Sequence, residues 1–155
     1  PYPILYLRLK NPPQRMVKVT GDKKAYLHLL LDADPCEAMV DRYLEESDMF
    51  VLERDGKVIG EAVVDEKGEI NLAVLPEYQG KLYGMYILSF LAGYYKDRFS
   101  CLWVGTSEGG VGYYERYGFV QDHVVKNFFT DNYPEPIIDN GRPCVDMTLL
   151  RLEIR

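Results

Sequence analysis

The sequence predicts a single α/β (α+β) domain over residues 1–155, with one mixed central sheet flanked by helices. Three observations lead to this prediction. The hydrophobic period changes from helical before residue 45 to strand-like between residues 49 and 75. Three short-linked strands in that middle stretch form an antiparallel meander. The strand–helix–strand order between residues 69 and 104 implies a β–α–β crossover that joins a parallel pair of strands.

Composition excludes several classes of protein. The chain has 18 basic and 24 acidic residues and a net charge of −6 at pH 7, which disfavours binding to a nucleic-acid backbone. Its longest apolar run, residues 82–93, is too short to cross a membrane, and the N-terminus lacks the features of a signal peptide. The widely spaced Cys36, Cys101 and Cys144 indicate reduced thiols. We therefore expect a cytoplasmic protein with no nucleic-acid and no membrane partner.

The N-terminal third predicts one strand and two helices. The strand runs over Ile4–Lys10 and ends at a pair of prolines, and a short helical stretch covers about Asp22–Leu31. A second helix begins at Asp34, which can cap it, with Pro35 at the first helical position and Glu37 reaching back to the cap. The apolar face of that helix is expected to carry Met39, Val40, Tyr43 and Leu44.

The middle of the chain predicts the meander. Strands over Met49–Leu52 and Lys57–Val64 flank Asp55-Gly56, which is a strong signal for a two-residue hairpin turn. A third strand, Glu69–Leu75, follows a short glycine-containing turn and ends at Pro76.

The second half predicts two helices that alternate with strands. A helix over about Gly80–Lys96 and a buried strand over Ser100–Val104 complete the crossover. A short helix over about Gly110–Tyr117 ends at Gly118, a typical C-cap residue. The first of these helices is expected to bury Met85, Leu88, Ala92 and Tyr95. Two closing strands, about Phe119–Phe128 and Cys144–Glu153, flank a proline-rich loop.

The junction from Val74 to Gly84 carries the main functional signal. A strand ends there, a proline-marked turn follows, and a helix begins among glycines. Free N–H groups and the helix dipole at such a start bind anions, phosphates in particular. Gly80 and Gly84 allow close approach to the backbone, and Lys81 adds a cation. The same pattern is also common in turns that bind nothing.

Two segments together resemble the GCN5-related N-acetyltransferase (GNAT) family. Residues 79–84 are similar to its acetyl-CoA-binding motif, [QR]xxGx[GA], and residues 112–119 (GYYERYGF) are similar to its second recurrent segment, (F/Y)YE(K/R)xGF. The resemblance covers nearly the whole chain from about residue 34 and implies the GNAT fold, with acetyl-CoA as co-substrate and no metal.

The resemblance also implies a set of cofactor-binding residues, with two departures. Leu82 stands where the motif usually has its first glycine, and the loop after the buried strand has Ser107 where many members place an asparagine. The implied cofactor-binding residues are Leu72, Ala73, Val74, Gln79, Gly80, Lys81, Leu82, Tyr83, Gly84, Met85 and Ser107.

The implied reaction is direct attack of a primary amine, from a small molecule or a peptide, on acetyl-CoA. Tyr114, by its place in the second segment, is the candidate general acid for the departing thiolate; the alternative is that it only packs. Glu69 is the candidate base, directly or through water, and the alternative is a solvated hairpin glutamate. Glu108 and Asp131 are weaker candidates for the base.

The acceptor is constrained only by charge. The acidic excess favours a cationic amine, with Glu69, Glu108, Asp131 and Glu135 as the places to look for its site. The loop over residues 127–137 combines aromatic and acidic side chains and is interpreted either as a substrate wall or as a latch on the core. A non-catalytic acyl-CoA-binding or regulatory module of the same fold is the alternative function. A homodimer built through the C-terminal strands is compatible with both functions.

Overall fold

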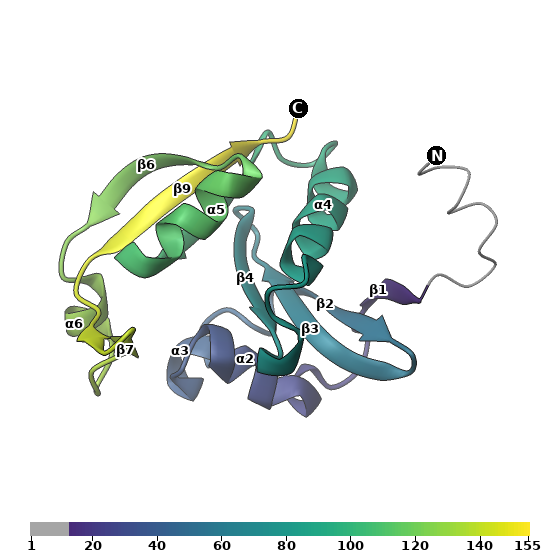
Figure 1. Ribbon diagram of the computed structural model, residues 1–155, viewed down its shortest axis with the longest axis horizontal. Helices are drawn as coiled ribbons and strands as arrows, with labels where there is room; N and C mark the ends of the chain where they lie inside the picture. The colour runs from purple at the N-terminus through teal and green to yellow at the C-terminus, as the bar shows by residue number, and fades with distance from the viewer. Residues whose placement is uncertain (1–12) are drawn as a thin grey trace.

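The structure, a computed structural model, describes residues 13–155 and is organised around a seven-stranded mixed sheet (Figure 1). The strands lie in the order β1-β2-β3-β4-β5-β9-β6. Only the pair β4–β5 is parallel, so the predicted meander and crossover are both confirmed. The strands are β1 (Gln14–Lys18), β2 (Asp48–Arg54), β3 (Lys57–Val64), β4 (Glu69–Val74), β5 (Cys101–Thr106), β6 (Val120–Val125) and β9 (Met147–Glu153).

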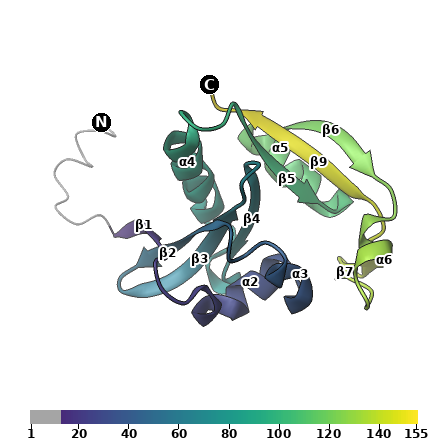
Figure 2. The same ribbon diagram turned by 180° about the vertical axis from the view of Figure 1, so that it is seen from behind.

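Helices cover both faces of this sheet. Figures 1 and 2 show α4 and α5 on one face, and α2 and α3 on the other. The longer helices are α2 (Leu27–Ala33), α3 (Glu37–Asp41), α4 (Tyr83–Tyr95), α5 (Val111–Tyr117) and α6 (Phe128–Asn132), and the 3-10 turns are η1 (Lys23–Tyr26), η2 (Pro76–Tyr78) and η3 (Glu108–Gly110). Within residues 13–155, none of the helices has the length and apolarity that a membrane crossing requires.

The core consists of two apolar clusters, one on each face of the sheet. The α4 face buries aliphatic and aromatic side chains from the central strands against Ile87, Leu88 and Leu91. The opposite face buries Leu30 of α2 and Val40 of α3 against β2 and β3. Burial of these side chains is the dominant stabilising term and fixes which side of each strand faces which helix.

Local signals in the sequence account for the confirmed turns. Asp55 and Gly56 have φ of 51° and 78°, as a type I′ hairpin between antiparallel strands requires. Gly118 has a φ of 130°, and its N–H bonds back to the last turn of α5, which confirms the predicted C-cap.

The parallel pair is the feature that positions the site. Only Glu69–Trp103 and Ile70–Val104 are paired between β4 and β5, so the two strands separate beyond residue 70. The second half of β4 therefore has a neighbouring strand, β3, on one side only.

Helix α4 differs from its prediction in start and in face. It begins at Tyr83 rather than Gly80, because Leu82 adopts a left-handed backbone (φ 67°) that cannot continue a helix N-terminally. Leu88 and Tyr95 are buried as predicted, whereas Met85 and Ala92 are only half-buried. The helix buries Ile87 and Leu91 in their place, so the face that packs on the sheet is rotated about the helix axis from the predicted one.

The predicted cap at Asp34 was wrong. The structure starts α3 at Glu37 with Cys36 at the N-cap position, and Asp34 directs its side chain to two tyrosine hydroxyls instead. A buried carboxyl gains more from two such donors than from one backbone N–H at the end of a five-residue helix.

Several elements lie outside the predictions. The predicted strand Ile4–Lys10 falls outside the described residues, and β1 was not predicted. The loop between the closing strands contains α6 and a small hairpin of β7 (Ile138–Asp139) and β8 (Arg142–Pro143), whose turn is the Asn140-Gly141 pair. These short elements lack a periodic pattern long enough to recognise.

Candidate active site

Two cavities meet beside β4. The first, the α4 cavity, has a volume of about 530 Å³ and lies where β4, η2, the start of α4 and α5 converge. The second, the acidic cavity, has a volume of about 680 Å³ and lies between α2, β4, β5 and the loop that contains α6. Both volumes fall in the range of small-molecule sites.

The α4 cavity gathers most of the residues that the sequence predicted to bind a cofactor. Nine of the eleven line it, together with Tyr114. Lys81 lies beside the cavity, with its ammonium 6.0 Å from the centre of the Tyr78 ring, which is itself part of the lining. Ser107 is elsewhere: it lines the acidic cavity, and its hydroxyl donates to Asp139 at 3.0 Å. The remaining lining residues are Asp32, Tyr78, Tyr113 and Arg116.

The separation of β4 from β5 leaves backbone groups facing the α4 cavity. Gly68 accepts a hydrogen bond from Trp103 on the β5 side, so the alternate residues Leu72 and Val74 direct their polar groups to that same side. The Val74 carbonyl accepts from the Gln79 side-chain amide at 2.9 Å, as expected for a carbonyl without a strand partner there. This hydrogen bond also fixes Gln79 at the cavity. Ala73 points its polar groups toward β3 and lines the cavity with its methyl group.

The loop before α4 depends on two left-handed residues. Gly80 has a φ of 74° and Leu82 a φ of 67°. A Cβ at Gly80 would meet nothing within 4 Å. Glycine is therefore favoured at this position by the left-handed backbone conformation and not by close packing. Leu82 departs from the motif, yet it takes the conformation that a glycine at that position would favour. Its side chain is 76% exposed at the rim of the cavity.

Gly84 serves a different purpose from the one predicted. The sequence suggested that it lets a ligand approach the backbone, but a Cβ there would overlap the Tyr113 hydroxyl. Gly84 is buried, and the space beside it is occupied by Tyr113 of α5. The glycine therefore brings α4 and α5 together at the base of the α4 cavity.

Cationic side chains surround this cavity despite the net charge of −6. The Lys57 ammonium lies 5.4 Å from the centre of the Tyr78 ring, and the Arg54 guanidinium lies 5.8 Å from that of Tyr83. Both rings, and Arg116, are part of the lining. Stacking on these rings holds the cations near the cavity, although the chain as a whole is negative.

Tyr114 is well placed to hold a proton. It sits on α5 among the rings of Tyr113 and Phe119, and it lines the α4 cavity. Burial, with smaller contributions from Tyr113 and Glu61, raises the pKa of Tyr114 above its ordinary value. The phenol is therefore protonated at neutral pH and can act as a donor in the cavity.

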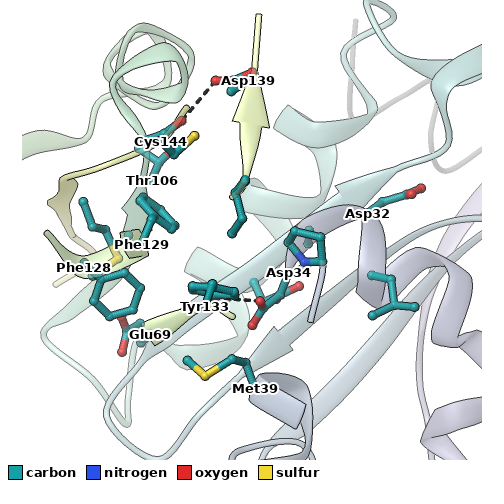
Figure 3. A pocket seen from close by; sticks show the side chains of 18 of the residues that line it. Asp32, Asp34, Met39, Glu69, Thr106, Phe128, Phe129, Tyr133, Asp139 and Cys144 are labelled. Carbon is teal, nitrogen blue, oxygen red and sulfur yellow. Dashed lines mark hydrogen bonds between the residues drawn. The ribbon is translucent and has the colours of Figure 1, made fainter. Parts of the chain in front are cut away.

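The acidic cavity has carboxyl groups on every side. Asp32, Asp34, Asp65, Glu69 and Asp139 line it, and no lysine or arginine of residues 13–155 does. Figure 3 shows Asp139 at one end, the aromatic rings of Phe128 and Phe129 on the side of Glu69, and Asp32 across from them.

A hydrogen-bonded chain ties the loop with α6 to the other wall of this cavity. Tyr133 donates to one oxygen of the buried Asp34 at 2.7 Å (Figure 3), and Tyr43 donates to the other at 3.0 Å. Asn71 of β4 in turn donates to the Tyr43 hydroxyl at 2.9 Å, while its own carbonyl oxygen is buried without a partner. These hydrogen bonds join the loop that contains α6 to Asp34, to Tyr43 and to β4.

The predicted acidic residues divide into two groups. Glu69 lines the acidic cavity, where burial and the neighbouring Asp65 raise its pKa above the ordinary value. Glu108 borders a neighbouring depression, and Asp131 and Glu135 line neither the α4 cavity nor the acidic cavity. The loop over residues 127–137 does form a wall, but it contributes apolar and aromatic side chains (Phe128, Phe129, Tyr133 and Ile137) and not its acids.

Sequence reasoning missed Glu61. This residue of β3 is 0% exposed, and neither carboxyl oxygen has a hydrogen-bond partner. Burial, and then the charge of Asp32, raise its pKa well above the ordinary value, so the group is neutral. The available signal was a lone charged residue inside the otherwise apolar stretch of residues 58–64.

Sequence reasoning also missed Asp32. This exposed residue in the last turn of α2 lines both the α4 cavity and the acidic cavity. No local pattern marks it, because its importance lies in its place between the two cavities.

Across residues 13–155, no group of three or more His, Cys, Asp or Glu side chains is arranged to hold a metal ion.

Comparisons with known proteins agree on one family. A sequence profile of the acetyltransferase (GNAT) domain matches residues 45–121. The uncharacterized N-acetyltransferase YvbK of Bacillus subtilis (strain 168) is 28% identical over 135 residues, which cover 81% of this chain and 87% of that protein. A GNAT family acetyltransferase from Elizabethkingia anophelis, solved with acetyl-CoA bound, is 31% identical with a TM-score of 0.84, over 92% of this chain and 99% of that one. An IAA acetyltransferase from Bacillus cereus ATCC 14579 is 32% identical with a TM-score of 0.79, over 90% and 99% of the two chains.

Proposed function

The chain belongs to the GNAT family of acetyltransferases, and from that premise we propose that it transfers the acetyl group of acetyl-CoA to a cationic primary amine. The observation that carries the proposal is the pair of cavities that meet at Asp32 beside the free edge of β4. One is bordered by cations and backbone donors, which suit a polyanionic cofactor. The other is lined by five carboxyl groups, which suit an ammonium group.

Acetyl-CoA is assigned to the α4 cavity. Free N–H groups at the turn before α4, over Gly80–Tyr83, would hold the pyrophosphate, and Lys81, Lys57 and Arg116 would balance its charge. Such an arrangement would let a chain with a net charge of −6 bind a polyanion, because the cations near the cavity would offset the net negative charge locally.

The chemistry is assigned to β4 and α5. The N–H groups of Leu72 and Val74, on the open side of β4, would pair with the pantetheine arm and polarise the thioester carbonyl, where negative charge develops during attack. Tyr114 would give its proton to the departing thiolate, because its phenol is protonated and lines the same cavity.

The acceptor is assigned to the acidic cavity. Its carboxyl groups would attract an ammonium group, and the rings of Phe128 and Phe129 would pack against the carbon chain that bears it. Glu69, the candidate base from the sequence, lines this cavity at the start of β4, where its carboxyl group would draw the ammonium group in.

A thiol-release assay tests the function. Acetyl-CoA is incubated with 1,4-diaminobutane, spermidine, glucosamine and a lysine-containing peptide, each alongside N-acetylglycine as an acceptor without an amine. Turnover with a cationic amine, and none with N-acetylglycine, is the expected result. The alternative function, a non-catalytic acyl-CoA-binding module, predicts tight acetyl-CoA binding by calorimetry with no turnover on any amine. Leu82 keeps the loop geometry that the missing glycine would provide, which supports acetyl-CoA binding under both functions and leaves turnover as the property that separates them.

We also propose that the chain forms a single domain, which the continuous sheet from β1 to β6 supports. The three free cysteines support a reducing, cytoplasmic location. A homodimer through the C-terminal strands is supported by β6, which ends the sheet and exposes Val120 and Val124 by 50% and 51%. Light scattering at several protein concentrations tests the dimer.

A further inference from the structure

Asp32 occupies the place where the two substrates must meet. Among the residues that the structure describes, it alone lines both the α4 cavity and the acidic cavity. Direct attack requires the amine nitrogen to come within about 3.5 Å of the thioester carbon, so the acceptor must reach the boundary between the cavities. An exposed carboxylate at that boundary is the ionisable group that the attacking nitrogen meets there.

The pairing of β3 with β4 shows where one cavity gives way to the other. After burial, the charge of Asp32 is the other cause that raises the pKa of Glu61 on this face of the sheet. Glu61 is paired with Ala73, which lines the α4 cavity, while the next pair on the same face, Val63–Asn71, lines the acidic cavity. Asp32 therefore lies over the row of residues at which one cavity gives way to the other.

The competing base, Glu69, lies too far along the same strand for direct proton transfer. Glu69 and Ala73 are four positions apart, which at about 3.3 Å per residue is roughly 13 Å between their Cα atoms. A glutamate side chain is too short to bring its carboxyl group within hydrogen-bond distance, about 3 Å, of a nitrogen that far away. Glu69 can attract the ammonium group into the acidic cavity, but it cannot take the proton directly at the boundary.

The surroundings of Asp32 leave it as the negative charge at the boundary. Glu61 on β3 is buried and neutral, and two carboxyl groups with such different environments are a common way to divide acid and base roles. The η1 lysines are engaged elsewhere: Lys23 bonds to three backbone carbonyls and Lys24 pairs with Glu37 and Asp41. The other titratable groups on the elements packed against α2 are Tyr26 of η1, Lys57 of β3, Glu69 of β4, and Glu37 and Asp41 of α3, the last two paired with Lys24.

We propose that Asp32 is the group that accepts the proton of the acceptor amine, an inference that rests on the proposed acetyl transfer. The nitrogen of the ammonium group gives one proton to a carboxylate oxygen of Asp32 and then attacks the thioester carbon. The C–N bond forms, the C–S bond breaks, and the thiolate takes a proton from Tyr114. Asp32 is exposed and passes its proton to solvent, and the second amine proton, released as the amide forms, reprotonates the Tyr114 phenolate, so that one proton is released per turnover.

The pH dependence of Asp32→Asn is the test. An alkylammonium group has a pKa of about 10.4, so without a base only the small free-amine fraction reacts near neutral pH. With the best acceptor from the panel above, we expect kcat of Asp32→Asn to fall at least about 100-fold at pH 7. Its kcat/KM for the amine should then rise about tenfold per pH unit from pH 7 to 9, while the wild type changes much less.

Two comparisons make the result decisive. Glu46→Gln removes an exposed carboxylate that lines neither cavity and controls for net charge. Glu69→Gln tests the alternative base and should raise KM for the amine more than it lowers kcat. The proposal is overturned if Asp32→Asn keeps the wild-type pH profile, if only its KM for the amine rises, or if Glu69→Gln alone reproduces the tenfold slope. Failure of the wild type to acetylate any amine would instead refute the proposed function. Calorimetric binding of acetyl-CoA shows that each variant is folded.

Discussion

Replacement of Glu61 by glutamine isolates the energetic effect of one buried carboxyl group. Glu61 is 0% exposed and both its oxygens lack a hydrogen-bond partner, so the ionised form has neither water nor a donor to stabilise it. Burial, followed by the charge of Asp32, raises its pKa well above the ordinary value in the folded state. Glutamine has the same shape as the neutral acid but cannot ionise, so the variant removes the titration while keeping the packing.

The sign and size of the effect follow from proton linkage. Because the folded-state pKa is raised, the folded chain retains a proton that the unfolded chain releases above a pH of about 4.3. The contribution of Glu61 to stability is therefore complete below that pH and is lost as the pH rises through the folded-state pKa. Across that window the free energy of unfolding attributable to Glu61 falls by about 1.4 kcal/mol per pH unit.

Urea unfolding of the wild type and Glu61→Gln at pH 4, 5, 6 and 7 measures this difference. The two proteins should be of similar stability at pH 4. Glu61→Gln should then become the more stable one by about 1.4 kcal/mol for each pH unit until the folded-state pKa is passed. Glu46→Gln, an exposed change of the same kind, should show no such trend. A stability difference between wild type and Glu61→Gln that stays constant from pH 4 to 7 would refute the argument, because it would mean that Glu61 ionises alike in both states.

Three further perturbations test other parts of the structure. Tyr114→Phe should lower kcat by about 100-fold or more with little change in acetyl-CoA affinity, measured by thiol release and calorimetry; an undiminished rate would remove Tyr114 from the acid role. Leu82→Gly removes the strain of a left-handed non-glycine residue, about 1–2 kcal/mol, but the glycine stabilises the unfolded chain by up to about 1 kcal/mol through its greater conformational entropy. The free energy of unfolding, measured by thermal unfolding, should therefore rise by about 0–2 kcal/mol, and a decrease would contradict the assigned backbone strain. Tyr133→Phe leaves one oxygen of the buried Asp34 unsatisfied and should cost about 1–3 kcal/mol in urea unfolding, whereas an unchanged midpoint would show that water replaces the hydroxyl.

Features that depend on neighbouring residues could be predicted from the sequence. The Asp55-Gly56 turn, the meander and the glycine that ends α5 each follow from backbone preferences within a few positions, and all are confirmed. Ten of the eleven residues predicted to bind a cofactor are consecutive or nearly so, from Leu72 to Met85, and nine of these line the α4 cavity, whereas the distant Ser107 does not.

Features that depend on distant contacts could not be predicted. Asp34 satisfies the pattern of a helix cap, but Tyr133, from the other end of the chain, and Tyr43 compete for its oxygens. Gly84 satisfies the pattern of a ligand-approach glycine, but its space is taken by Tyr113 of α5. In both cases a tertiary contact overrode a local preference worth about 1 kcal/mol.

By itself, the sequence determined the meander, the β–α–β crossover, the position of the glycine-containing turn before α4 and the candidate proton donor Tyr114, because each rests on local geometry or on a contiguous motif. Only the tertiary structure decided where the acceptor would bind and which carboxyl group stands between the cavities. The five acids of the acidic cavity come from four separate segments, and Asp32 gains its position from the packing of α2 on β4. A charged side chain on an exposed helix end has no sequence signature of function, since what it faces is set by the packing of the two clusters of apolar residues that place the helix.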